Sequence, residues 1–149
     1  MASEFKMVHR VEFSDTDLAG LIHFSKYLRF MEVTEHAFFR SLGLSILMWD
    51  SHKVGWPRVD VQCSFSSPAR FEDEIEAHLT VREKKSRSIT YDFVFRRVRP
   101  KPAIEVARGS MTAVCVSRDP ATQRMRAVPI PGAVASKIEA APTPKGKSR

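Results

Sequence analysis

Glycine, cysteine and long apolar runs are all scarce in this sequence of 149 residues, and each scarcity excludes a class of site. No two of the six glycines lie closer than twelve positions apart, so neither a G-x-G-x-x-G turn nor a Walker loop for nucleotide phosphates can form. The two cysteines, Cys63 and Cys115, are too few for a zinc knuckle or a disulfide framework. The longest stretch without a charged residue, 127–136, has only ten residues, whereas a membrane-spanning helix needs about 20.

The start of the chain and its charge restrict its setting and its ligands. The first ten residues lack the apolar core of a secretory signal, and both cysteines fall within apolar runs, so we expect a reduced, cytoplasmic protein without a membrane span. The 24 basic and 17 acidic residues give a net charge of +7. Such a charge suits an anionic ligand: a nucleic acid, an acidic membrane surface or a phosphorylated small molecule. The alternative is that it only keeps the surface solvated.

The spacing of apolar residues predicts one long helix after a first strand. Apolar and polar residues alternate over 7–13, which predicts the strand. Over 25–42 the polar residues recur at spacings of three and four, which predicts a helix of about 18 residues. Ser25 is suited to be its N-cap, and Gly43 to end it. Because the polar stripe is narrow, a sheet should curl around this helix.

Four or five further strands should follow the helix. Alternation predicts strands over 59–65, 75–81, 89–95 and, less regularly, 104–116, with a short last strand within 124–128. Gly109 indicates a bulge or bend in the fourth of these runs. Since no second helix is available as a crossover, the strands should be antiparallel neighbours. The sequence therefore predicts an α+β fold: one long central helix wrapped by a five- to six-stranded antiparallel sheet, in a single domain over 1–131. Residues 132–149 should form a C-terminal extension with a basic, disordered tail.

Candidate chemistry is concentrated between the first strand and the helix. Asp15 and Asp17 stand just before a predicted helix N-terminus, where unpaired backbone N–H groups carry partial positive charge. A carboxylate there could attack a carbonyl or activate water, while the N–H groups at 23–25 stabilise an oxyanion. The alternative is that both aspartates are ordinary turn or capping residues. We expect no metal site, because a calcium loop starting at Asp15 would need a glutamate where Lys26 stands.

Three motifs in the chain resemble one enzyme family. They are F-S-D-T-D-L-A-G-L-I-H-F-S-K-Y followed by a helix with M-E, then G-W-P-R-V-D-V, then S-P-A-R-F-E-D-E-I. Together they resemble the hotdog-fold acyl-CoA thioesterases of the 4-hydroxybenzoyl-CoA thioesterase and YbgC-like type, over about 7–128. The D-x-D-x-x-G segment is the most specific of the matches. The resemblance implies a hotdog fold, which agrees with the order of elements read from periodicity.

The resemblance also implies roles for individual residues. It makes Asp17 the catalytic carboxylate, as nucleophile or general base, and Phe24 the residue whose backbone N–H polarises the thioester carbonyl. Asp15 would hold the loop. His23 departs from the family pattern, in which an aromatic residue is frequent at this position. It either binds the thioester or orients water, or it fills the aromatic position.

A basic turn, R-E-K-K-S-R-S, is the candidate site for coenzyme A. The resemblance implies that its cations bind the coenzyme A phosphates, and charge-assisted bonds to phosphate are strong. The residues concerned are Lys84, Lys85 and Arg87. Without the resemblance, the turn would be a solvated hairpin end.

The leading hypothesis is an acyl-CoA thioesterase that releases a free acid and coenzyme A. It implies a small-molecule acyl-CoA substrate, no cofactor beyond the coenzyme A of the substrate, no metal, and a homodimer or homotetramer with its site between subunits. One alternative is a hotdog hydratase or dehydratase acting on enoyl thioesters. Another is a non-catalytic module that binds acyl-CoA or nucleic acid, although no nucleic-acid ligand is expected.

Overall fold

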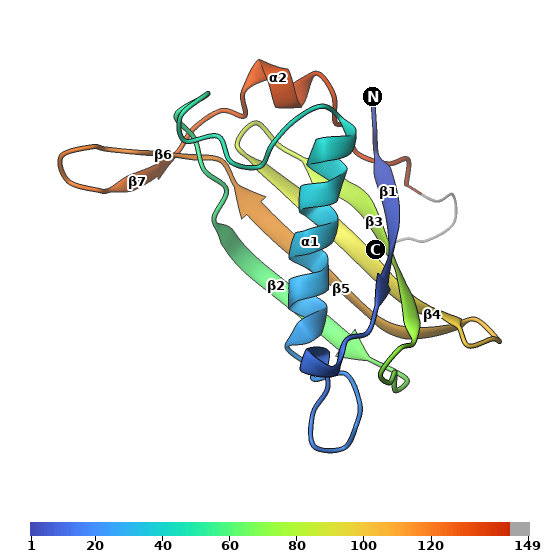
Figure 1. The fold of residues 1–149 in the computed structure, drawn as a ribbon. Helices are drawn as coiled ribbons and strands as arrows, with labels where there is room; N and C mark the ends of the chain where they lie inside the picture. The colour runs from blue at the N-terminus through green and yellow to red at the C-terminus, as the bar shows by residue number, and fades with distance from the viewer. Residues whose placement is uncertain (144–149) are drawn as a thin grey trace.

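In the computed structural model, which describes residues 1–143, one long helix lies across the concave face of an antiparallel sheet (Figure 1). The helix is α1 (Lys26–Ser41), and a short 3-10 turn, Phe13–Asp15, precedes it. The sheet order is β1-β3-β4-β5-β2. The strand bounds are β1 Glu4–Arg10, β2 Arg58–Phe65, β3 Glu74–Lys84, β4 Ser88–Arg99 and β5 Ile104–Val114. The expected α+β architecture is confirmed. No helix within the described residues is long and apolar enough to cross a membrane.

Alternation along the strands directs one row of side chains onto the helix. Strands β3 and β4 bury every second residue from Ile75 to Val81 and from Ile89 to Phe95. The aromatic rings of this row form the core with Phe38 and Phe39 of α1. The helix thus buries its apolar side on the inner face of the sheet, as its narrow polar stripe predicts.

Gly109 of β5 permits a close approach between the helix and the sheet. A Cβ built on this glycine would collide with the Gln62 carbonyl oxygen and lie 2.7 Å from Met31 Cε of α1. The expected irregularity in β5 is found elsewhere, because the pairing of β4 with β5 shifts register at Val106. Gly109 itself pairs regularly with Phe93 and Cys63, so close packing rather than a bulge accounts for it.

Strand β2 forms one edge of the sheet and lies partly outside the cover of the helix. Its inward positions are Arg58, Val61, Cys63 and Phe65, of which Cys63 packs against the core, while Val59 falls at a register shift and has no cross-strand partner. Val61 is 37% exposed and Phe65 is 52% exposed. An apolar row on an unpaired edge is a surface that proteins normally cover.

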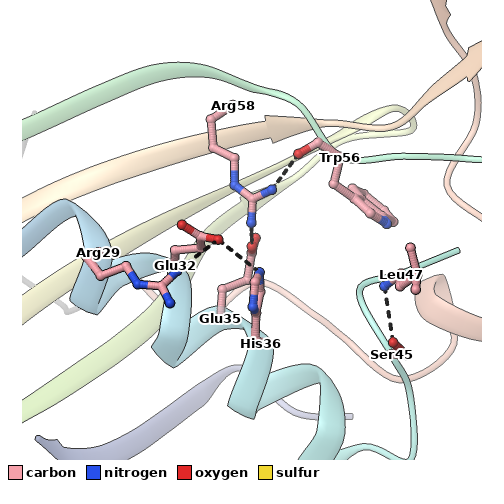
Figure 2. A network of polar contacts seen from close by, with 8 residues as sticks. All are labelled: Arg29, Glu32, Glu35, His36, Ser45, Leu47, Trp56 and Arg58. Carbon is pink, nitrogen blue, oxygen red and sulfur yellow. Dashed lines mark hydrogen bonds and ion pairs between the residues drawn. The ribbon is translucent and has the colours of Figure 1, made fainter.

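One buried ion pair fastens α1 to the start of β2 (Figure 2). Glu35 of the helix is fully buried, and Arg58 donates to its Oε1 and, at 2.6 Å, to the carbonyl oxygen of Trp56. Burial raises the pKa of Glu35 to about 7, although Arg58 opposes the rise. Burial and the Glu35 carboxylate together raise the pKa of Tyr91 of β4 well above its usual value.

The chain after β5 packs further than expected. A hairpin of β6 (Val116–Arg118) and β7 (Met125–Ala127) projects from the body (Figure 1), and the short helix α2 (Gly132–Ala135) follows it. Val134 and Ile138 are fully buried, and residue 138 bridges to Ala2. Packing therefore does not stop at the expected boundary of 131 but continues to Ile138. The last part of the expected tail, 144–149, lies outside the described residues.

Candidate active site

The loop between β1 and α1 closes around the carboxylate of Asp17. Its Oδ1 accepts hydrogen bonds from the backbone N–H groups of Ala19 at 2.8 Å and Leu21 at 3.2 Å. Gly20 adopts φ +76°, a left-handed conformation that glycine tolerates without strain. Among the described residues none donates a hydrogen bond to Oδ2, and the side chain is exposed. One carboxylate oxygen is therefore held and the other is available.

Asp15 supports this loop rather than facing solvent as a second reactive group. Its Oδ2 accepts from the Glu12 N–H at 2.8 Å, and its carbonyl oxygen accepts from the His23 N–H at 2.8 Å. The loop is also tied to the β2–β3 connection, since the Ile22 N–H donates to the Ala69 carbonyl oxygen at 2.9 Å. These bonds fix the position of Asp17 relative to the helix.

Phe24 presents an unused backbone donor at the start of α1. Its N–H donates to no acceptor among residues 1–143, whereas the flanking N–H groups of His23 and Ser25 are both bonded. The Phe24 side chain is 65% exposed and stacks on the His23 ring, with 4.5 Å between centroids. A free N–H beside a helix N-terminus is suited to hold an oxyanion.

Asp17 and Phe24 line two adjoining hollows. One cavity of about 510 Å³ continues toward the β2–β3 connection. The other residues on its wall are Leu21, Ile22, Tyr27, Phe65, Ser66, Ser67, Pro68 and Ala69. The second hollow lies over the loop itself and includes His23 and Leu18. The structure thus brings Asp17, His23 and Phe24 together at one site.

The wall of this cavity was not predicted from the sequence. Tyr27 fits the apolar side of the helix, and the segment 65–69 follows the end of β2 with no local sign of a site. Long-range contacts, of Ile22 with Ala69 and of Leu21 with Arg70, set that segment beside Asp17.

The basic turn does not reach Asp17 within a single chain. Figure 1 shows the β3–β4 turn and the Asp17 loop at opposite ends of the sheet, and β3 runs for eleven residues between them, roughly 35 Å. Lys84 is occupied elsewhere, because its Nζ donates to the carbonyl oxygens of Ala135 at 2.8 Å and Ile138 at 2.6 Å. Lys85 and Arg87 are exposed. Of the three cations expected to bind phosphate, Lys84 is therefore engaged within the fold, and Lys85 and Arg87 remain exposed to solvent.

Metal-binding side chains are not gathered here. Within the part of the chain that the structure describes, no three or more His, Cys, Asp or Glu side chains could together hold a metal ion.

Comparison with known proteins identifies the family. The family model of the thioesterase-like superfamily matches residues 11–138. The chain belongs to this superfamily. In sequence it is 27% identical, over 137 residues, to the 4-hydroxybenzoyl-CoA thioesterase of Pseudomonas sp. strain CBS-3, covering 88% of this chain and 94% of that enzyme. The chain is thus a thioester hydrolase by family.

Solved structures of this superfamily share the fold. The Pseudomonas enzyme superposes with a TM-score of 0.82 at 24% identity, over 91% of this chain and 99% of that chain. A 1,4-dihydroxy-2-naphthoyl-CoA thioesterase from Synechocystis superposes with a TM-score of 0.80 at 21% identity, over 90% of this chain and 94% of that chain. An aspartate-to-asparagine mutant of 4-hydroxybenzoyl CoA thioesterase was solved with 4-hydroxybenzoyl CoA. It superposes with a TM-score of 0.81 at 23% identity, over 91% of this chain and 99% of that chain. The expected hotdog fold is confirmed.

Proposed function

We propose that this thioesterase hydrolyses acyl-CoA thioesters at Asp17. The observation that carries the proposal is that Asp17 and Phe24 line one cavity. Among residues 1–143, Asp17 Oδ2 accepts no hydrogen bond and the Phe24 N–H donates none. A thioester carbonyl bound at that N–H lies beside the carboxylate. Hydrolysis needs both a group that attacks or activates water and a donor for the oxyanion.

The reaction has two balanced routes. In the first, Asp17 takes a proton from water, the hydroxide oxygen bonds to the thioester carbon, and the C–S bond breaks as the proton passes to the coenzyme A thiolate. In the second, Asp17 Oδ2 bonds to that carbon and expels the thiolate, and water then cleaves the resulting anhydride. In both, the Phe24 N–H stabilises the negative charge on the carbonyl oxygen.

Isotope labelling separates the two routes. In a single turnover in ¹⁸O-labelled water, the general-base route places one labelled oxygen in the acid product. The nucleophilic route can leave that label in the Asp17 carboxylate, which mass spectrometry of the peptide detects.

The cavity beside Asp17 favours an aromatic acyl group. Its wall contains Phe24, Tyr27 and Phe65, and aromatic side chains pack well against planar rings. Two of the structural relatives are named for hydroxylated aromatic acyl groups. We therefore propose aryl-CoA thioesters as the substrate class.

A second copy of the chain would complete the site. Pairing the free β2 edges antiparallel about a two-fold axis covers the exposed apolar row of β2. It also brings the partner's Arg58 end of β2 to the Phe65 end of this copy, because the two strands run in opposite directions. The β3–β4 turn shares the Arg58 end. Lys85 and Arg87 of one copy would thereby approach the Asp17 site of the other and bind the coenzyme A phosphates.

Thiol release from a panel of acyl-CoA thioesters tests the proposal. The panel holds hydroxybenzoyl, short-chain and long-chain thioesters, and the wild type is compared with Asp17→Asn. We expect the aryl thioesters to be hydrolysed fastest. Asp17→Asn should lower kcat by roughly 10²–10⁴-fold while substrate binding, measured by calorimetry, persists.

A matched control keeps the test specific. Asp50→Asn changes a second exposed loop aspartate and should leave turnover unchanged. If no thioester releases thiol, or if Asp17→Asn turns over like the wild type, the proposal is wrong and a non-catalytic acyl-CoA binding role would replace it.

A further inference from the structure

Ser25 does not cap the helix as its position predicts. It lies at the N-terminus of α1 with φ −65° and ψ −22°, and its side chain makes no capping hydrogen bond. Its hydroxyl oxygen lies instead 2.7 Å from Nδ1 of His23. The backbone N–H of Ser25 also donates to this nitrogen, at 3.2 Å. Two groups of one residue therefore converge on one ring nitrogen.

This arrangement determines where the neutral His23 ring carries its proton. A backbone N–H can only donate, so Nδ1 must accept and is unprotonated. The proton of the neutral ring is then on Nε2, which becomes the donor of the side chain. The ring is held further by its stacking on Phe24 and by the backbone bond from the His23 N–H to Asp15.

We propose that Ser25 is a positioning residue for hydrolysis, which orients His23 so that Nε2–H donates to the thioester beside Asp17. His23 and Asp17 line the same hollow. The ionised carboxylate of Asp17 can only accept hydrogen bonds, so a donor additional to the Phe24 N–H has to be another group. His23 carries such a donor, and its ring stacks on the Phe24 ring in the same hollow. The inference rests on the proposed function.

Kinetics of Ser25 variants test this role. We expect Ser25→Ala to lower kcat about tenfold and to change KM less than about twofold, because the ring loses orientation but the site keeps its shape. This is less than the roughly 10²–10³-fold loss that follows removal of an oxyanion donor itself. Ser25→Thr, which retains a hydroxyl, should recover most of kcat.

The control is Ser41→Ala at the other end of α1. The Ser41 hydroxyl donates to the Phe38 carbonyl oxygen at 2.6 Å. Ser41→Ala therefore also removes one serine hydroxyl from the end of this helix, but far from the site. Its kcat should equal that of the wild type. Equal kcat in Ser25→Ala and Ser41→Ala, or no recovery in Ser25→Thr, would overturn the positioning role.

A spectroscopic measurement needs no substrate. Long-range ¹H–¹⁵N spectra of the histidine rings, with His23 identified by its absence in His23→Gln, report which nitrogen is protonated. The wild type should hold the Nε2–H form alone, and Ser25→Ala should show a mixture of the two forms. A protonated Nδ1 in the neutral wild-type ring would contradict the inference.

The two measurements separate this inference from the proposed function. If the wild type hydrolyses no thioester, the proposed function fails and the catalytic role of Ser25 fails with it, whatever the ring spectra show. If Asp17→Asn abolishes turnover while Ser25→Ala leaves kcat unchanged, the function stands and only the role of Ser25 is lost.

Discussion

At the scale of single residues, the buried Glu35 is the most consequential side chain outside the active site. Its carboxylate is held by Arg58, which is itself only partly exposed. Removing one member of a buried pair leaves an uncompensated charge, whereas replacing both with apolar residues of similar volume is often neutral or stabilising. The pair therefore fixes geometry more than it stabilises the fold.

Substitutions of this pair should show that asymmetry. At pH 8, Arg58→Met alone should lower the free energy of unfolding by about 3–5 kcal/mol, and the double variant Glu35→Leu, Arg58→Met should recover most of the loss. The loss in Arg58→Met should be smaller at pH 6, because Glu35 can then bind a proton. Chemical denaturation at matched protein concentration measures all three proteins. An equal loss in the single and double variants would contradict the explanation.

The raised pKa of Glu35 also predicts a pH dependence of stability. Between pH 4.5, the ordinary value, and pH 7 the folded protein keeps a proton on Glu35 that the unfolded chain releases. The free energy of unfolding should therefore fall as the pH rises through this window, by roughly 3 kcal/mol from this group. In Glu35→Gln that contribution disappears. The difference between the denaturation curves of wild type and variant across pH 4.5–7 measures it.

Sequence reasoning can bring some residues of the structure together and not others, for a physical reason. Asp17 and Phe24 are separated by seven positions, and one local strand-to-helix connection places them together, so a motif can reveal them. Glu35 and Arg58 are 23 residues apart. Nothing in the helical spacing shows that Glu35, three positions from the half-exposed Glu32, faces the sheet.

At the scale of elements, the contact of α1 with β5 depends on a missing side chain. Gly109→Ala should place a methyl group against the Gln62 carbonyl oxygen and Met31. The sheet and the helix would have to separate, at a cost of about 1–3 kcal/mol or more in the free energy of unfolding. Gly132→Ala is the matched control, because a Cβ there meets nothing within 4 Å. Thermal denaturation of both variants checks the prediction, and equal midpoints would contradict it.

The elements were predictable where the pattern was local and regular. The strands β3 and β4 alternate strictly, and α1 has a clear polar stripe, so these elements follow from spacing alone. The segment after β7 has no such pattern. Its packing depends on Lys84, whose Nζ reaches carbonyl groups more than 50 residues away, and no local signal records such a contact.

At the scale of the whole molecule, the exposed inward row of β2 predicts association. Val61→Lys should place a charge on the edge where two copies would meet, and we expect a monomer with little thioesterase activity. Val8→Lys alters β1, the opposite edge, at a residue that is 51% exposed. This control should keep the assembly and the activity. Analytical ultracentrifugation and thiol release measure both, and an unchanged mass in Val61→Lys would contradict the proposed interface.

The contact between residue 2 and residues 137–139 affects when the chain can fold during synthesis. The backbone N–H of Ala2 donates to the Lys137 carbonyl oxygen, and the Glu139 N–H donates to the Ala2 carbonyl oxygen. A ribosome adding about 5–20 residues per second must work for roughly 7–27 s after residue 2 before these partners exist. During that interval Ala2 lacks these partners, and Val134 and Ile138 cannot yet join the core. Residue 2 should therefore gain these contacts only after residue 139 has been added to the chain.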